Sequence, residues 1–69
     1  MTKQRLSRAE SQEQTRQRIL ESATRLFMDV GFRPTSLEQI AADAGYTVGA
    51  IYSNFGNKLE IGMAVLAVL

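Results

Sequence analysis

The chain lacks both cysteine and histidine, and it has a single proline among its 69 residues. Without cysteine there is no disulfide and no thiolate ligand for a metal. Without histidine there is no imidazole for acid–base chemistry or for zinc. The acidic residues are scattered, and nothing suggests a paired carboxylate site. We therefore predict that the chain is not an enzyme and uses no cofactor and no metal.

Long apolar segments are also missing. The longest apolar run, from Ile61 to Leu69, has nine residues, whereas a helix that crosses a bilayer needs about 20. The N-terminus is polar and has no apolar stretch of the kind found in signal peptides. We therefore expect a cytoplasmic protein without a membrane partner.

The net charge is close to zero, at +1, but the charges are unevenly placed. Residues 1–35 carry an excess of three positive charges, and residues 36–69 carry an excess of two negative charges. A basic N-terminal half is compatible with phosphate contact. On charge alone, however, a solvated helix face is the commoner explanation. Charge therefore leaves both interpretations open.

Apolar residues at helical spacing predict an all-α domain. A first helix is expected from about Ser11 to Val30, with Gly31 ending it. Its apolar face follows the spacing i, i+1, i+4, i+7, i+8 and i+11, with Ile19, Leu20, Ala23, Leu26, Phe27 and Val30. Residues 1–10 lack this spacing and predict a mobile basic arm, for which contact with DNA and no role at all are equally open.

A second helix follows the Arg-Pro link and has two candidate start signals. Thr35 with Glu38 and Ser36 with Gln39 are both possible capping boxes, shifted by one residue. The start of this helix is therefore uncertain by one residue. Gly45 ends it.

Two further helices complete the pattern. The third runs from Val48 to about Phe55, and the fourth begins at Lys58. Thr47 and Asn57 are the expected N-caps. The connections between the helices are short, so the helices must pack at steep angles.

This order of parts is typical of a helix-turn-helix, which we place at residues 36–55. The expected fold is a three-helix, homeodomain-like bundle with the start of a fourth helix. We assign residues 11–60 to the helix-turn-helix domain. Residues 61–69 are expected to be a truncated fourth helix that leads to a C-terminal domain absent from this chain.

The expected recognition helix has a thin, uncharged face. Gly49 and Ala50 carry almost no side chain, so base edges can approach the backbone closely. Glycine in a helix costs about 1 kcal/mol against alanine, and close approach to DNA explains such a cost. Relief of a helix–helix contact is the alternative explanation for Gly49. The other members of the face are hydrogen-bonding or apolar side chains that suit base edges: Thr47, Val48, Ser53 and Asn54.

A second set of polar groups lies near helix starts, where free N–H groups and the positive end of the helix dipole favour a phosphate. The predicted phosphate contacts are Thr35 or Ser36, Thr47, Tyr52 and Lys58. Each hydroxyl at a helix start is also explained as a simple cap, which is the commoner use. Their convergence around one turn favours phosphate contact.

Together these residues resemble the N-terminal DNA-binding domain of the tetracycline-repressor (TetR) family of bacterial transcriptional regulators. The resemblance covers about residues 15–66, and its most specific part is the Gly49-x-x-Tyr52-x-x-Phe55 run followed by Lys58. The other matching stretches are Arg18-Ile19-Leu20, Ala23, Leu26-Phe27, Gly31-Phe32, Thr35-Ser36, Ile40-Ala41 and Ala44-Gly45. Two positions depart from the family pattern: position 54 is asparagine where histidine is frequent, and position 46 is tyrosine where a small aliphatic residue is usual.

The resemblance implies that the helix from Thr47 to Phe55 enters the major groove. It implies that Tyr52 and Lys58 contact phosphates and that positions 47–50, 53 and 54 face a double-stranded DNA operator. It further implies a homodimer on an inverted repeat, and a C-terminal domain that binds a small-molecule effector and releases the DNA. We expect the operator-reading domain of a repressor; a small helical protein-interaction module is the alternative.

Overall fold

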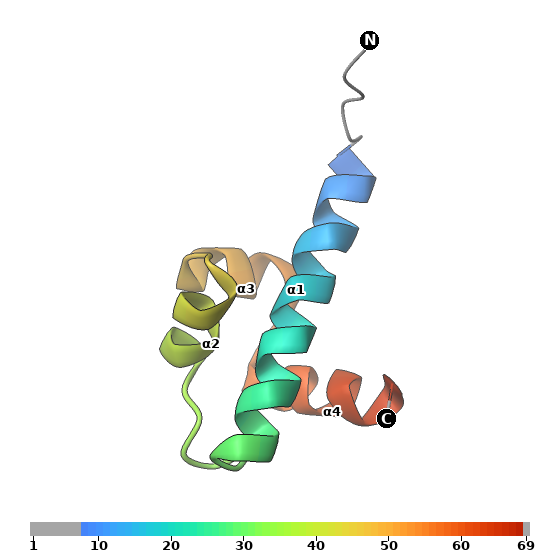
Figure 1. Cartoon of the computed structure of the whole chain (residues 1–69). Helices are drawn as coiled ribbons and strands as arrows, with labels where there is room; N and C mark the ends of the chain where they lie inside the picture. The colour runs from blue at the N-terminus through green and yellow to red at the C-terminus, as the bar shows by residue number, and fades with distance from the viewer. Residues whose placement is uncertain (1–7, 69) are drawn as a thin grey trace, which may run out of the picture.

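The computed structural model describes residues 8–68, with side chains from Glu10 onward, and these residues form four helices (Figure 1). The helices are α1 (Arg8–Asp29), α2 (Leu37–Ala44), α3 (Val48–Asn54) and α4 (Lys58–Val68). Within this range there is no strand, so the all-α prediction is confirmed. No helix in the same range is long and apolar enough to cross a membrane.

Helix α1 is longer at its N-terminal end than the sequence pattern predicts. It begins at Arg8 rather than near Ser11. The first residues, Arg8 to Glu10, include good helix formers but carry no apolar periodicity that would mark an extra turn. The expected arm therefore overlaps the helix at residues 8–10, and residues 1–7 lie outside the described residues. The first turns of α1 extend beyond the bundle that the other helices form (Figure 1).

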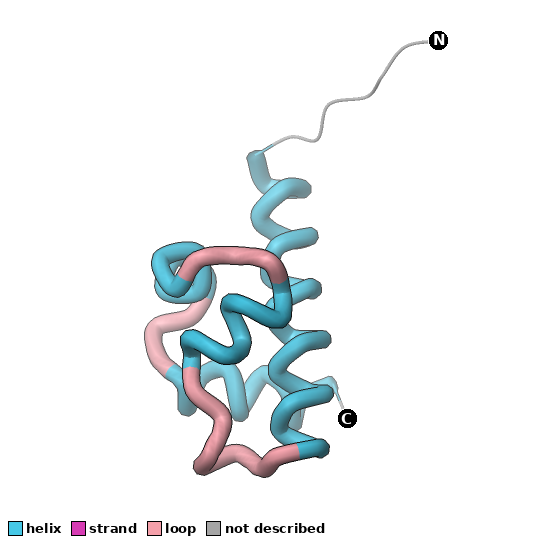
Figure 2. Tube along the Cα trace, turned by 60° about the vertical axis from the view of Figure 1, so that its left-hand side comes forward, coloured by secondary structure: helices cyan, strands magenta, loops and turns pink. Residues whose placement is uncertain are grey.

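All four helices contribute to one core. Helix α1 packs against each of the other three, and α2 also packs against α3 (Figure 2). The core consists of buried apolar side chains: Ile19, Leu20, Ala23, Ile40, Ala41, Ile51, Phe55, Ile61 and Val65. Most of the predicted stripe of α1 is thus in the core or packed against it. Val30, which directly follows the end of α1 at Asp29, is the exception, with 49% of its surface exposed.

The start of α2 resolves the choice between the two capping boxes. The Ser36 hydroxyl accepts a hydrogen bond from the Gln39 backbone N–H at 3.1 Å, and the Ser36 N–H donates to Gln39 Oε1 at 2.8 Å. Thr35 is instead 1% exposed, and its hydroxyl donates to the Gly31 carbonyl at 2.7 Å. The C-terminal end is as predicted, since Gly45 adopts a left-handed conformation with φ of 82°. Ser36 is therefore the N-cap, and Thr35 is a buried structural residue.

We expect Ser36→Ala to lower the free energy of unfolding by about 1 kcal/mol, because it removes both the cap and half of the capping box. Thermal unfolding followed by circular dichroism measures the change. Ser36→Asp keeps a capping oxygen and is the matched control, expected to retain most of the stability. Equal destabilisation by alanine and aspartate would show that the cap is not what stabilises this end of α2.

Helices α3 and α4 also begin at the predicted caps. Thr47 Oγ1 accepts from the Ala50 N–H at 3.2 Å, and Asn57 Oδ1 accepts from the Glu60 N–H at 2.9 Å. Helix α3 ends at Asn54, so that Phe55 follows as its C-cap, and Phe55 is 3% exposed. The seven residues of α3 are too few for a helix that is stable alone. The orientation of α3 therefore depends on how it packs against the bundle.

Candidate nucleic-acid interface

One face of α3 is open to solvent. Gly49, Tyr52 and Ser53 are exposed and follow the spacing i, i+3 and i+4, so they lie on the same side of the helix. Ile51 is fully buried on the opposite side. Ala50 and Asn54 are half-buried at the edges of the exposed face. The structure thus brings together, on one accessible surface, most of the residues predicted to face DNA.

Val48 is placed differently from the rest of the predicted reading face. It is half-buried and packs against the core cluster. The first residue of α3 therefore contributes to the attachment of the helix to the bundle. Its predicted contact with a thymine methyl group stays a prediction, and core packing is the role the structure shows.

Gly49 is not required by packing within the domain. Outside the backbone of α3 itself, a Cβ atom added there would meet only Thr47 Oγ1 among the described residues, at 3.6 Å, which is an ordinary van der Waals distance. The alternative that Gly49 relieves a helix–helix contact is therefore wrong. An alanine would fit and would favour the helix. Close approach by DNA, the other explanation predicted from the sequence, stays a prediction.

Two polar side chains of α3 hydrogen-bond to their own helix. The Ser53 hydroxyl donates to the Gly49 carbonyl at 3.0 Å, and Asn54 Nδ2 donates to the Ala50 carbonyl at 2.9 Å. Each bond spans one helical turn and fixes the side chain along the helix surface. Each bond uses one donor of the side chain, and the side-chain oxygen can still accept a hydrogen bond. Both residues can therefore accept hydrogen bonds, and Asn54 retains a second N–H donor.

The predicted phosphate contacts are distributed over the starts of three helices and the exposed face of α3. Thr47 is exposed at the start of α3, and the Tyr52 side chain is 56% exposed. Ser36 is half-buried at the start of α2. Thr35 lies directly before it, but its burial and its internal hydrogen bond place its hydroxyl out of reach of a phosphate. Ser36 is therefore the better candidate of the two.

Lys58 reaches from the start of α4 to the link between α1 and α2. Its ammonium donates to the Arg33 carbonyl at 3.1 Å and lies 4.4 Å from the centroid of the Phe32 ring. Arg33 is three residues before Ser36 in the chain. In the fold, the ammonium of Lys58 thus lies beside the segment that leads into the N-terminal end of α2. No local sequence pattern predicts this position.

Arg16 is a further cation near α3 that sequence reasoning missed. Its guanidinium lies 4.7 Å from the centroid of the Phe55 ring, directly after the end of α3. The sequence gives no local signal for this contact, because the two residues are 39 positions apart. It adds a positive charge from α1 beside the C-terminal end of α3.

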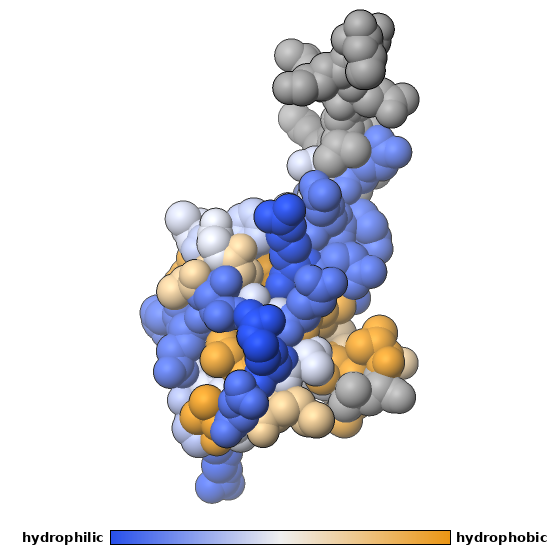
Figure 3. Space-filling model, viewed as in Figure 1, coloured by the Kyte–Doolittle hydropathy of each residue, from blue (hydrophilic) through white to orange (hydrophobic). Residues whose placement is uncertain are grey.

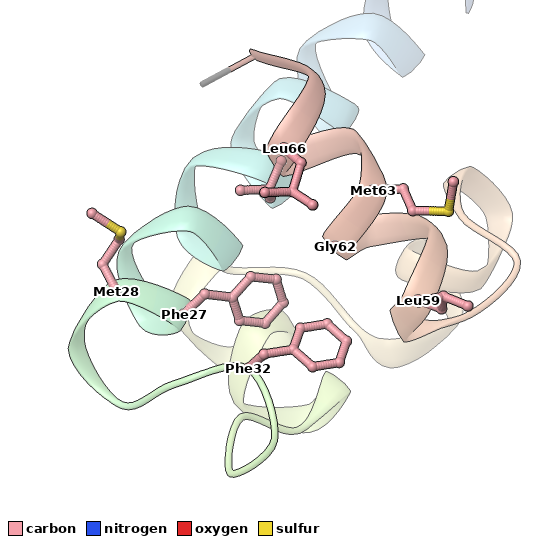
Figure 4. Close-up of a pocket in the computed structure, with 8 residues that line it drawn as sticks. Phe27, Met28, Phe32, Leu59, Gly62, Met63 and Leu66 are labelled. Carbon is pink, nitrogen blue, oxygen red and sulfur yellow. The ribbon is translucent and has the colours of Figure 1, made fainter.

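A second surface feature lies between the end of α1 and α4. It is an apolar groove of about 400 Å³, lined by Phe27, Met28, Phe32, Leu59, Gly62, Met63, Val65 and Leu66 (Figure 4). Several of these side chains are largely exposed, including Leu66 at 72% and Met28 at 74%. Apolar surface also gathers over α4 in Figure 3, whereas the visible face of α1 is mainly hydrophilic. In the described part of the chain, no cluster of acidic residues could hold a metal ion.

Comparison with protein families identifies this arrangement of helices. Residues 19–65 match the model of the family described as bacterial regulatory proteins, tetR family. The chain belongs to the TetR family. The match begins at Ile19, within the buried stripe of α1, and ends at Val65 on α4, so it includes the whole helix-turn-helix. The family assignment and the helix-turn-helix fold predicted from the sequence are both confirmed.

Curated relatives are similar over most of this chain. The HTH-type transcriptional regulator SrpR of Pseudomonas putida is 49% identical over 80% of this chain and 26% of its own length. TtgW, also of Pseudomonas putida and named an uncharacterized HTH-type transcriptional regulator, is 48% identical over 91% of this chain and 46% of its own. The HTH-type transcriptional repressor BepR of Brucella suis is 40% identical over 90% of this chain and 29% of its own length. No solved structure matches the chain.

The chain spans between about a quarter and a half of the length of these relatives. Their names describe transcriptional regulators, and the prediction that this TetR-family chain is not an enzyme is confirmed. The individual DNA contacts predicted from the sequence stay predictions, with Thr35 disfavoured by its burial.

Proposed function

We propose that this chain is the operator-reading domain of a TetR-type transcriptional regulator that binds double-stranded DNA. The exposed, uncharged face of α3 supports this proposal most strongly, because it contains a glycine that internal packing does not require. A helix with such a face can approach base edges closely in the major groove. Ala50, Ser53 and Asn54 are the proposed base-reading residues beside Gly49.

Phosphate contact is proposed for groups around this face. Thr47 and Ser36 cap the starts of α3 and α2 and lie beside free backbone N–H groups. Tyr52 contributes a hydroxyl, and Lys58 contributes a full positive charge. Phosphate contacts position a protein on the duplex without reading its sequence. The near-neutral net charge is consistent with this scheme, since helix N-termini supply part of the positive potential.

The regulatory setting of this domain is proposed from the family. We propose that the domain is part of a longer, cytoplasmic protein that binds an inverted repeat as a homodimer. This protein would act as a repressor, and a small-molecule effector would release it from DNA. The effector would bind in a C-terminal domain that follows α4. The apolar face of α4 around Leu59, Met63 and Leu66 is suited to packing against such further chain.

We expect Lys58→Ala to weaken binding to duplexes of every sequence several-fold and to reduce the slope of log K against log salt by about 1, because one phosphate contact is lost. Fluorescence anisotropy with a random-sequence duplex, between about 50 and 200 mM salt, measures both quantities. Lys58→Arg keeps the charge and serves as the control. An unchanged affinity of Lys58→Ala at low salt would remove Lys58 from the phosphate contacts.

A helical protein-interaction module is the second candidate function, and the apolar groove between α1 and α4 is the observation that favours it. Salt dependence separates the two candidates. Binding to DNA weakens steeply as salt rises, whereas burial of an apolar groove by a protein does not depend on counterion release. A chain that shows no salt-dependent DNA binding would favour the interaction module.

A further inference from the structure

The aromatic ring of Phe32 is held between α1 and α4. Its centroid lies 5.0 Å from that of Phe27 at the end of α1, with the two rings tilted by 59°. On the other side the ring lies directly against Gly62 of α4, where an added Cβ would be only 2.8 Å from Phe32 Cε1. Figure 4 shows both rings beneath Gly62. The ring position therefore depends on the absence of a side chain at residue 62.

The same ring contacts Lys58. Lys58 and Gly62 are spaced i and i+4 on α4, so they lie on one face of the helix. The ring that packs on Gly62 also presents its face to the Lys58 ammonium, at 4.4 Å from the ring centroid. The Arg33 carbonyl, next in the chain after Phe32, accepts from the same ammonium at 3.1 Å. The adjacent residues Phe32 and Arg33 thus fix the side chain of Lys58, which is long and would otherwise be flexible.

We propose that Phe32 is a positioning residue for Lys58, and that its ring holds the ammonium at the link into α2 so that it meets a phosphate. A lysine ammonium has three N–H donors, and the Arg33 carbonyl uses one of them. The Phe32 ring covers part of the ammonium, and the rest of its donor surface is available for a phosphate oxygen. This inference rests on the proposed contact of Lys58 with DNA, and it assigns Phe32 a function beyond packing against Gly62.

The test compares Phe32→Leu with Phe32→Tyr. Leucine keeps an apolar side chain against Gly62 but removes the ring, and we expect it to weaken binding to a random-sequence duplex by about two- to fivefold at low salt. Phe32→Tyr keeps the ring and is expected to have the wild-type dissociation constant. In the Lys58→Ala background, Phe32→Leu should cause no further loss. An equal loss in both backgrounds, or no loss in either, would overturn the positioning role.

A readout without DNA separates this inference from the proposed function. In the free protein the ring face should shift the Lys58 Hε resonances upfield in proton NMR, and Phe32→Leu should abolish that shift. Unshifted resonances in the wild-type protein would overturn the positioning role directly. A shifted resonance together with unchanged DNA affinity of Lys58→Ala would leave the geometry intact and reject the DNA contact, and with it the function assigned to Phe32.

Gly62→Ala gives a second test that leaves Phe32 and Lys58 unaltered. The added methyl group forces the Phe32 ring to move, while alanine favours the helix and so protects the fold. We expect the Lys58 Hε shift to change and DNA affinity to fall by a similar factor, about two- to fivefold. Leu66→Ala is the matched control, since Leu66 lines the same groove and is 72% exposed. Wild-type shifts and affinity in Gly62→Ala would contradict the inference.

Discussion

Gly49→Leu is expected to abolish most of the sequence preference of DNA binding while the domain stays folded. Among the described residues, an added Cβ would contact only Thr47 Oγ1, at 3.6 Å, apart from the backbone of α3 itself, and the position is exposed, so a longer side chain would extend into solvent. A bulky residue there would hold α3 away from the base edges without removing any phosphate contact. Affinity for the preferred site should fall by about a hundredfold or more, because specific binding typically exceeds non-specific binding by at least that factor.

The measurement compares anisotropy titrations on the preferred duplex and on a random-sequence duplex. Affinity for the random duplex should change little, since phosphate contacts carry that binding. Gly49→Ala adds a single methyl group and should give an intermediate loss. Gln12→Leu places the same bulk on an exposed position of α1 and is the matched control. Wild-type sequence preference in Gly49→Leu would show that this face of α3 does not enter the groove.

Ile51→Ala is expected to lower the free energy of unfolding by about 2–5 kcal/mol. Ile51 is fully buried in the core cluster, and it points from α3 into the bundle directly opposite the reading face. Truncation removes apolar contact and leaves a cavity. A single small core rarely supplies more than about 3–5 kcal/mol, so the loss is comparable to the whole stability and should unfold much of the population at 25 °C.

Urea unfolding followed by circular dichroism measures this loss. Ile51→Val removes one methyl group and should cost about 0.5–1.5 kcal/mol. Leu66→Ala removes the same number of carbon atoms from a side chain that is 72% exposed, and it should change stability by less than about 0.5 kcal/mol. Comparable losses in Ile51→Ala and Leu66→Ala would contradict the assignment of the core.

The parts of the fold that the sequence predicted well are those marked by local chemistry. The bounds of α2 follow from one of the two predicted capping boxes and from Gly45, and the start of α3 follows from Thr47. A cap bonds to atoms only two or three residues away, so its partner is visible in the sequence. The first turn of α1 was missed because it carries neither a predicted cap nor an apolar stripe.

The parts that could not be predicted depend on contacts between distant residues. Thr35 and Ser36 have equivalent sequence patterns, and only the packing of the α1–α2 link buries one and leaves the other as the cap. The position of Lys58 beside Phe32 requires the angle between α1 and α4. Gly49 shows the reverse case. The sequence left two explanations open for it, and the structure removed one, because an added Cβ would make only an ordinary contact with Thr47 Oγ1 and would touch no other helix of the described chain.

The central claim is that α3 reads DNA on a surface supported by phosphate contacts, and selection of binding sites from random duplex DNA tests it most directly. Because paired half-sites require two recognition helices, the chain should be joined after α4 to a two-stranded parallel coiled coil. We expect an enriched inverted repeat with half-site centres about one helical turn, 10–10.5 base pairs, apart or at a multiple of that spacing, and loss of the enrichment in Gly49→Leu. Recovery of no preferred sequence by the wild-type domain, under conditions where it is folded and dimeric, would contradict the account.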